Sequence, residues 1–255
     1  MGIIIKSPQE ISIMRQAGRI LAAILKTLSQ ETKPGMKTRE LDAISVEEMK
    51  KYGVKSSFKN YRGYPAHICV SVQDELVHGI PGDRVLKEGE IVSLDAGVIY
   101  QGFQVDAAVT IGLGEISPMA RRLLEATKGS LDSGIEVARA GIRLGNVSAA
   151  IQEHAESRKF AIVREYSGHG VGRELHEEPQ IPNFGVPGQG PMLRRGMTLA
   201  LEPMLTVGDW HTRVLDNQWT VVTQDGSLCA HFEHTIAIGD EGAEVLTVHQ
   251  QVKPK

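Results

Sequence analysis

The sequence predicts an α/β (α+β) fold that contains two copies of one structural unit. Residues 86–95 (LKEGEIVSLD) and 193–202 (LRRGMTLALE) share a Leu, a basic residue, a Gly, a second Leu and a final acid. Residues 35–44 and 141–150 share a Gly, a basic residue and an Ala at matching places. A Ser-Pro pair opens a helical pattern upstream of each copy. Because self-similarity of this kind indicates a duplicated unit, we expect two pseudo-symmetric halves.

Two helices and a hairpin are expected in the first half. The first helix begins at Ser7-Pro8, where Glu10 completes a capping box, and runs to about Gln30. The second is expected to be capped by Thr38 and to end near Gly53. The expected strands span residues 68–72 and 91–111, and a turn at residues 100–102 divides the second stretch into a hairpin.

The second half repeats this order of elements. A third helix opens at Ser117-Pro118 and ends at Gly141, and a fourth is capped by Asn146 and runs to about Lys159. The remainder is expected to be strand and loop, with a Gly/Pro-rich surface loop at residues 181–191 beside the site. No change of composition marks a linker. A single catalytic domain is therefore expected over residues 1–255, with halves of about 1–115 and 116–255.

Composition indicates a compact cytoplasmic protein. A chain of 255 residues with 41% hydrophobic residues buries roughly 70 to 75% of its unfolded surface. Two cysteines provide no disulfide framework, which fits a reducing compartment. A net charge of −3 argues against nucleic acid as a substrate. The charged N-terminal segment and the short apolar runs indicate neither a signal peptide nor a membrane segment, and the length suits a monomer.

Four carboxylates interrupt stretches that otherwise resemble buried strands. Asp95 and Asp106 lie in the first half, and Glu202 and Glu233 in the second. A carboxylate inside an apolar strand costs roughly 2 kcal/mol or more unless it is paired or bound to a metal. Because Asp95 and Glu202 occupy matching places in the repeat, the acids should meet near the pseudo-twofold axis. This pattern predicts a shared metal site.

The spacing of the first two acids defines their geometry. A tight hairpin that turns at residues 100–102 makes Asp95 and Asp106 opposite or diagonal neighbours on one face of the sheet. Two carboxylates roughly 5 Å apart repel each other unless a cation lies between them. For either residue alone, an Asp that accepts backbone hydrogen bonds at a strand end is an equally good interpretation.

Several histidines are candidates for the same site. His169 lies between two glycines, which let the backbone approach closely, and it would supply the only nitrogen to the carboxylate cluster. His78 and His176 are candidates for proton donors or for groups that stabilise an oxyanion, although a polar loop residue is the alternative for both. Two further histidines flank the last acid and are placed to orient it: His231 and His234.

These residues and their contexts resemble methionine aminopeptidase over nearly the whole chain. The motifs that carry the resemblance are VHGIPG, GHGVGRELHEEPQIPNFG, LALEPM and FEHT, together with the five ligand candidates. No domain is inserted between His176 and Glu202, so the resemblance is to the short bacterial type I form. It implies a pita-bread fold, in which a pseudo-twofold duplication forms a mixed or antiparallel sheet with helices on one face.

The resemblance implies two divalent metal ions per chain, with Co, Mn, Fe and Zn all compatible with the ligands. Asp106 and Glu233 would bridge the two ions. Asp95 would chelate one ion, and His169 with Glu202 would complete the other. The ions would activate a water molecule at neutral pH, and Glu202 would act as the general base.

The resemblance also assigns substrate contacts. His176 would stabilise the tetrahedral intermediate, and His78 would contact the scissile amide and help its nitrogen leave. The methionine side chain would lie in a pocket of aromatic and sulfur groups, which suit a thioether. The pocket residues implied are Tyr61, Tyr64, Cys69, Leu175 and Trp219.

Three departures from the related sequences leave the ligands intact and bear on the surroundings of the site. Leu175 stands where Phe is common, and Val77 stands where Cys is frequent before His78. Gln104-Val105 replaces a more usual His-Gly before Asp106. They bear on the shape of the pocket and on inhibitor preference.

The implied reaction is removal of the initiator methionine from nascent polypeptides, near the ribosome, with a preference for a small second residue. A proline-directed aminopeptidase of the same fold is the nearest alternative, although those proteins usually carry an extra N-terminal domain. A metal-free relative that binds peptides would be expected to lack ligands, and none is missing here. A phosphoesterase is less compatible because no GxxxxGK segment is present, and HEEPQ does not match the HExxH motif of zincins.

Overall fold

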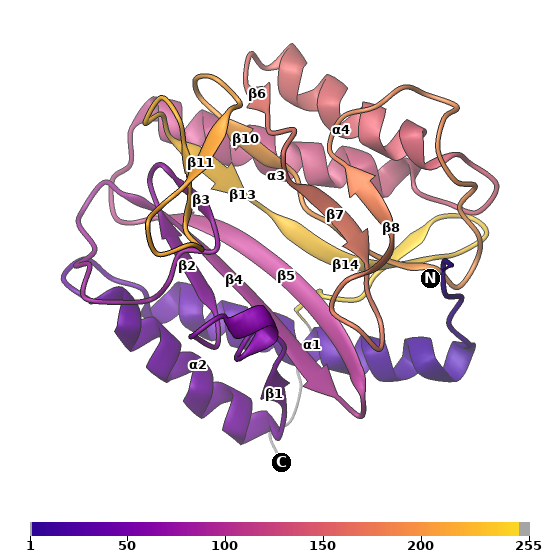
Figure 1. Ribbon diagram of the computed structural model, residues 1–255, viewed down its shortest axis with the longest axis horizontal. Coiled ribbons are helices and arrows are strands. Elements are labelled where there is room, and N and C mark those ends of the chain that lie inside the picture. The colour runs from indigo at the N-terminus through magenta and orange to yellow at the C-terminus, as the bar shows by residue number, and fades with distance from the viewer. Residues whose placement is uncertain (1, 250–255) are drawn as a thin grey trace.

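The computed structural model describes residues 2–249, in which four α-helices cover one face of a large antiparallel sheet (Figure 1). Figure 1 shows α1 and α2 along the part of the sheet that the first half of the chain forms, and α3 and α4 along the other part. The predicted combination of helices on one face and antiparallel strands is confirmed. The helices are α1 (Pro8–Glu31), α2 (Thr38–Tyr52), α3 (Pro118–Val137) and α4 (Leu144–Ser157).

The start of α1 follows the predicted capping box. The Ser7 Oγ accepts a hydrogen bond from the Glu10 backbone N–H at 3.3 Å, and the Ser7 N–H donates to the Glu10 carboxylate at 2.9 Å. Fully buried apolar residues recur every three or four positions, so one face of the helix packs on β4 and β5. These residues are Met14, Ala17, Leu21, Ile24 and Leu28.

The predicted caps of α2 and α4 are wrong because tertiary contacts take those side chains. Thr38 is the first helical residue of α2, and its hydroxyl contacts the backbone of Gly82 instead. The N-cap of α4 is Arg143, and the Asn146 Oδ1 accepts a hydrogen bond from Gly188 N at 2.6 Å. The third helix, α3, ends at Val137, before the predicted glycine stop.

The large sheet joins strands of both halves in the order β1-β4-β5-β14-β9-β7-β8, with β2 paired to β4 and β15 to β14. Two three-stranded sheets, β13-β10-β6 and β11-β12-β3, accompany it. The strands of the first half are β1 (Lys55–Ser56), β2 (Cys69–Val72), β3 (Glu75–Val77), β4 (Ile91–Tyr100) and β5 (Phe103–Gly112). Those of the second half up to the site are β6 (Ala161–Ile162), β7 (Ser167–Gly170), β8 (Glu177–Pro182), β9 (Thr198–Leu201) and β10 (Met204–Thr206). The last are β11 (Thr212–Val214), β12 (Val221–Thr223), β13 (Cys229–His231), β14 (Glu233–Ile238) and β15 (Ala243–Val245).

The predicted hairpin sets the register of the first two acids. Tyr100 pairs with Phe103, and the two residues between them have positive φ, which suits the right-handed twist of the strands. Asp95 therefore pairs with Ala108, and Asp106 pairs with Gly97. The two acids are diagonal neighbours on one face, as the spacing predicts.

The two halves meet where β5 pairs with β14. Only Glu233↔Ala108 and His234↔Ala107 are paired in this ladder. At the next position the buried Thr235 hydroxyl accepts a hydrogen bond from the Asp106 backbone N–H at 2.9 Å and donates to the Asp106 carbonyl at 2.8 Å. A side chain thus satisfies both backbone groups of Asp106, a candidate ligand.

Within residues 2–249, no helix is both long and apolar enough to cross a bilayer.

Replacing Thr235 with the isosteric Val should lower the free energy of unfolding by about 1 to 3 kcal/mol, because the buried Asp106 N–H and carbonyl lose their partner. Urea unfolding of both proteins measures the difference. Thr27→Val is the matched control, since the Thr27 hydroxyl makes only a 3.5 Å contact with Glu48. Equal effects of the two substitutions would contradict the role of the Thr235 hydroxyl.

Candidate metal centre

One cavity collects the residues that the sequence analysis assigns to the site, with the exception of His234. Its walls come from β2, β3, β4 and β5 of the first half, from β7, β13 and β14 of the second, and from the loops between strands. The ligand candidates that line it are Asp95, Asp106, His169, Glu202 and Glu233. The other predicted residues that line it are Tyr61, Tyr64, Cys69, His78, Leu175, His176 and Trp219.

The ligand candidates converge at one end of this cavity. One ligand atom each from Asp106, His169 and Glu233 can be chosen so that the three lie within 4.8 Å of one another. Glu202 directly follows β9, and its Oε1 lies 3.5 Å from the His169 Nε2. Asp95 is the diagonal neighbour of Asp106 on the adjacent strand. Four carboxylates and one imidazole therefore face one small space.

Electrostatics shows what this convergence costs. Burial raises the pKa of Asp95 to about 7. Burial, and then repulsion from neighbouring carboxylates, raises the pKa values of Asp106, Glu202 and Glu233 well above the usual range. The four groups cannot all be ionised at neutral pH unless positive charge is placed among them. Divalent cations supply that charge in carboxylate sites.

The donor atoms fit a metal. Asp95 Oδ1 and Glu233 Oε1 are buried and have no hydrogen-bond partner in the described structure, so both can accept a cation. The His169 Nδ1 lies 2.9 Å from the Gly170 carbonyl, and a hydrogen bond donated there leaves Nε2 with a free lone pair. Burial lowers the pKa of His169 to about 4, which keeps the ring neutral. Oxygen-rich sets with one imidazole suit divalent Mn, Fe, Co or Zn.

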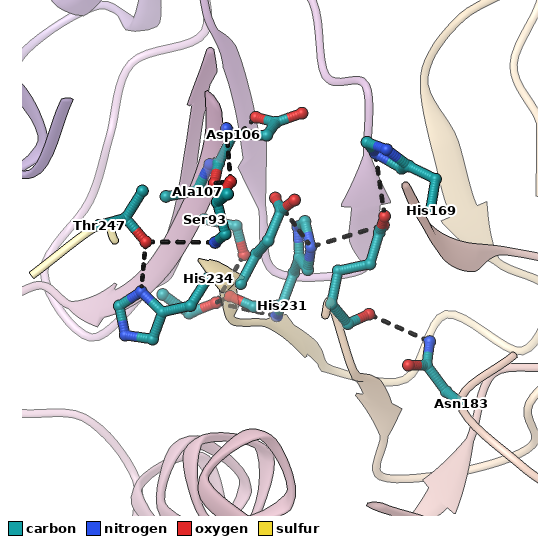
Figure 2. A network of polar contacts seen from close by, with 12 residues as sticks. Ser93, Asp106, Ala107, His169, Asn183, His231, His234 and Thr247 are labelled. Carbon is teal, nitrogen blue, oxygen red and sulfur yellow. Dashed lines mark hydrogen bonds and ion pairs between the residues drawn. The ribbon is translucent and has the colours of Figure 1, made fainter. Parts of the chain in front are cut away.

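The histidines next to Glu233 differ in direction (Figure 2). Figure 2 shows His231 facing the carboxylates, and its Nε2 lies 3.9 Å from Glu202 and 4.0 Å from Glu233. His234 points away and bonds Thr247 through Nδ1 at 2.8 Å. Consecutive residues of a strand alternate between faces, so only Glu233 and not His234 can face the site. The interpretation of His234 as a residue that orients Glu233 is therefore wrong.

Hydrogen bonds to the backbone hold these groups in place. The Thr110 hydroxyl lies 2.8 Å from the Ser93 hydroxyl and also bonds both the N–H and the carbonyl of His231. The Asn183 side-chain amide donates to the Glu202 carbonyl at 3.0 Å. Figure 2 shows this network around the cluster. The Thr110 hydroxyl therefore fixes the end of β13 at His231, and the Asn183 amide holds the backbone at Glu202.

Two histidines stand beside the cluster. The His176 ring lies 4.2 Å from the His169 ring, and its Nδ1 is 2.8 Å from the Tyr61 hydroxyl. His78 has a φ of 59°, and its ring meets those of Tyr166 and Trp219 edge-on. Burial lowers the pKa of His176 to about 3 and that of His78 to about 4, so both rings are neutral at pH 7.

The far end of the cavity is apolar. Tyr64 packs edge-on against both Phe58 and Trp219, and its hydroxyl donates to backbone carbonyls at 2.9 and 3.1 Å. Cys69 and Leu175 complete the cluster. Since burial raises the pKa of Cys69 well above its usual value, the thiol stays neutral. This end presents uncharged aromatic, aliphatic and sulfur surface.

Four lining residues were not identified from the sequence: Phe58, Arg62, Tyr166 and Ser167. Ser167 shares a strand face with His169, so period-two alternation could have found it. Phe58 and Tyr166 lie on irregular segments, and Arg62 lies in a short 3-10 helix (Tyr61–Gly63). No local pattern encodes the paths of these segments. The predicted loop at residues 181–191 touches the site only at its start, through Asn183, and then bonds α4 through Gly185 and Gly188.

The residues that depart from the related sequences lie in different surroundings. Val77 and Leu175 line the cavity. Val105 is in the core, and Gln104 bonds the loop after β7 instead of facing the ligands. Val77 and Leu175 therefore shape the wall of the cavity, whereas Gln104 supports a loop.

The sequence matches metallopeptidase family M24 over residues 12–240. It is 52% identical over 245 residues to methionine aminopeptidase 1 of Bacillus subtilis, covering 96% of this chain and 99% of that protein. The structure is similar to methionine aminopeptidase from Thermotoga maritima, with a TM-score of 0.96 at 50% identity over 97% of this chain and 100% of that chain. A prolidase from Pyrococcus furiosus is similar in fold, with a TM-score of 0.80 at 23% identity over 97% and 66% of the chains. The predicted pita-bread fold is thereby confirmed.

The contribution of Asp95 to the stability of the metal-free protein should fall as the pH rises from about 4 to about 7. Folded Asp95 has a pKa of about 7 and the unfolded residue about 3.8, so the folded state binds the extra proton in this window. This contribution amounts to roughly 4 kcal/mol at most. Thermal unfolding of chelator-treated parent and Asp95→Asn proteins across this range isolates it, because the buried histidines, whose pKa values are lowered, change the stability of both proteins in the opposite sense. A stability of the parent relative to Asp95→Asn that does not fall as the pH rises, or a fall that excess divalent cation leaves unchanged, would contradict it.

Proposed function

The chain belongs to metallopeptidase family M24 and, within it, to the bacterial type I methionine aminopeptidases, and on this premise we propose how its own residues perform the reaction. The activity is hydrolytic removal of the N-terminal methionine from polypeptides. The observation that carries the assignment to specific residues is the meeting of four carboxylates and one imidazole beside an apolar pocket. One end of the cavity carries the candidate metal ligands and the other is apolar, and a metallo-aminopeptidase needs both, for the metal ions and for the substrate side chain.

Two divalent ions would be held by the carboxylate cluster. We propose that Asp106 and Glu233 would serve both ions, that Asp95 would hold one, and that His169 and Glu202 would hold the other. When bound, the pair would supply a water molecule of lowered pKa and a Lewis acid for the scissile carbonyl. The unpartnered oxygens of Asp95 and Glu233 support this arrangement. Mn, Fe, Co and Zn all suit the ligands.

Glu202 is proposed as the general base. Its carboxylate lies between two imidazoles, 3.5 Å from the His169 Nε2 and 3.9 Å from the His231 Nε2. A carboxylate whose pKa burial has raised accepts a proton near neutral pH more readily than an exposed one. Glu202 would take the proton of the attacking water and pass it to the leaving amine.

His176 and His78 are proposed to contact the reacting amide. Both line the cavity next to the ligand cluster, and both rings are neutral, so each can donate one hydrogen bond. His176 would stabilise negative charge on the carbonyl oxygen, with Tyr61 at its Nδ1 fixing the ring. His78 would hold the amide nitrogen and help it leave.

The apolar end would receive the methionine side chain. Proposed contacts are Tyr61, Tyr64, Cys69, Leu175 and Trp219, which line the cavity. Uncharged aromatic and sulfur groups suit an unbranched thioether. With the side chain in this pocket, the substrate α-amine would lie next to the carboxylates, and this confines cleavage to the first residue.

The remaining context is also proposed. The substrates would be nascent polypeptides with a small second residue, met near the ribosome in the cytoplasm. Residues 1–255 would act as one catalytic domain and as a monomer; residues 1 and 250–255 lie outside the described structure. Neither nucleic acid as a substrate nor a membrane is proposed to take part.

Peptide hydrolysis tests this function against its nearest alternative. We expect metal-dependent release of free methionine from Met-Ala and Met-Gly peptides and little cleavage of X-Pro peptides. The physical reason is the apolar pocket beside the ligands, which offers Met more buried contact than short side chains. Product chromatography measures release. Cleavage confined to X-Pro peptides would favour a proline-directed enzyme, and no hydrolysis with any divalent metal would favour a binding protein.

Replacing the proposed base should abolish turnover with little effect on folding. Glu202→Gln keeps the side-chain shape and removes the proton acceptor, so kcat should fall by about 10²- to 10⁴-fold. Steady-state kinetics on Met-Ala peptides measures kcat, and thermal unfolding checks the fold. Glu153→Gln, on an exposed position of α4, is the matched control and should leave kcat unchanged. A fall of less than about threefold in Glu202→Gln would exclude it as the base.

A further inference from the structure

The loop that carries His176 connects β7 to β8 and has little secondary structure of its own. Gly172 N–H donates to the Glu174 carbonyl at 3.0 Å, which makes a tight turn. Leu175 and His176 follow before β8 begins at Glu177. Contacts from other parts of the chain must therefore hold this loop, because short loops without such contacts open readily.

Glu177 holds the loop from inside. Its Oε1 accepts hydrogen bonds from the backbone N–H groups of Arg173 at 2.8 Å and Glu174 at 3.3 Å. Its Oε2 forms an ion pair with the Lys6 ammonium group. The two side chains are only 3% and 4% exposed, so this ion pair is buried. A buried, hydrogen-bonded ion pair fixes geometry more firmly than a surface pair does.

Lys6 is itself anchored. Its backbone N–H donates to the Gly196 carbonyl at 2.8 Å, just before β9, and its ammonium lies 3.4 Å from the Ile4 carbonyl. Gly172 leaves room for the Lys6 side chain, since a Cβ there would lie 2.4 Å from the Lys6 Cε. The N-terminal arm thus reaches the loop through a gap that a side chain would close.

Further contacts hold the outer side of the loop. Gln104 on β5 donates its backbone N–H to the Gly172 carbonyl at 2.6 Å and its side-chain amide to the Arg173 carbonyl at 3.1 Å. The Arg173 guanidinium lies 4.4 Å above the Phe103 ring and bonds Glu10 at 3.0 Å. The Arg173 side chain is exposed, whereas the Lys6–Glu177 ion pair is buried. This ion pair is therefore the buried contact that anchors the loop.

We propose that Lys6 and Glu177 are positioning residues, which fix the loop at residues 172–177 and thereby place the His176 ring beside the ligand cluster. The proposal rests on the proposed function, in which His176 contacts the reacting amide. The ring must stay within reach of both the Tyr61 hydroxyl, 2.8 Å away, and the His169 ring, 4.2 Å away. An error of about 1 Å in a group that stabilises a transition state can cost about 10²-fold in rate.

The test replaces Lys6 with Met, which keeps the stem and removes the ammonium. We expect kcat on a Met-Ala peptide to fall about 10- to 100-fold while KM changes less than about threefold, because binding of the methionine side chain is retained. Amide hydrogen exchange at residues 172–177 should quicken at least about tenfold, since the Glu177 carboxylate loses its anchor. Manganese affinity, measured by titration of the metal-free protein, should stay within about twofold.

Two further variants separate positioning from stability. Lys6→Met/Glu177→Gln leaves no unpaired buried charge, so its unfolding midpoint should return toward that of the parent while kcat stays low. Arg15→Met breaks an ion pair between α1 and Glu244 that does not touch the loop, and it should leave kcat and loop exchange unchanged.

Four results would count against the proposal or its premise. Recovery of kcat together with stability in the double variant would overturn the positioning role, as would unchanged loop exchange in Lys6→Met. An active parent whose Lys6→Met variant keeps its kcat would overturn the positioning role alone. A parent that releases no methionine would overturn the proposed function, and loop exchange would still report whether Lys6 anchors the loop.

Discussion

The structure depends on the burial of four carboxylates in one cavity. Such a cluster is unfavourable without cations, because burial and mutual repulsion both raise the pKa values of its members. The sheet nevertheless brings the acids together by register: Asp95 and Asp106 across one hairpin, and Glu233 on the strand that pairs with β5. The buried carboxylates lower the stability of the metal-free protein, and for the same reason they attract divalent metal strongly.

Rigid surroundings make that attraction specific. Hydroxyls of Thr110 and Thr235 bond backbone groups beside the ligands and do not occupy the carboxylate oxygens. The loop that carries His176 depends instead on Lys6, which lies far away in the sequence. The site thus combines ligands on strands, whose geometry the ladder fixes, with a histidine on a loop that side chains tie down.

Local patterns predicted what depends on local geometry. The capping box of Ser7 and Glu10 and the hairpin turn at residues 100–102 both depend on neighbours in sequence, and the spacing of Asp95 and Asp106 follows from that turn. The caps proposed at Thr38 and Asn146 failed because distant backbone groups compete for those side chains. Phe58 and Tyr166 lie on irregular segments, so only the folded chain shows that they face the cavity.

Diffraction from crystals grown with manganese, measured on both sides of the manganese absorption edge, tests the central claim most directly. The account predicts two anomalous peaks in the cavity, each within coordination distance of carboxylate oxygens from Asp106 and Glu233, and one of them next to His169. Peaks located elsewhere, or an empty cavity at saturating manganese, would contradict it.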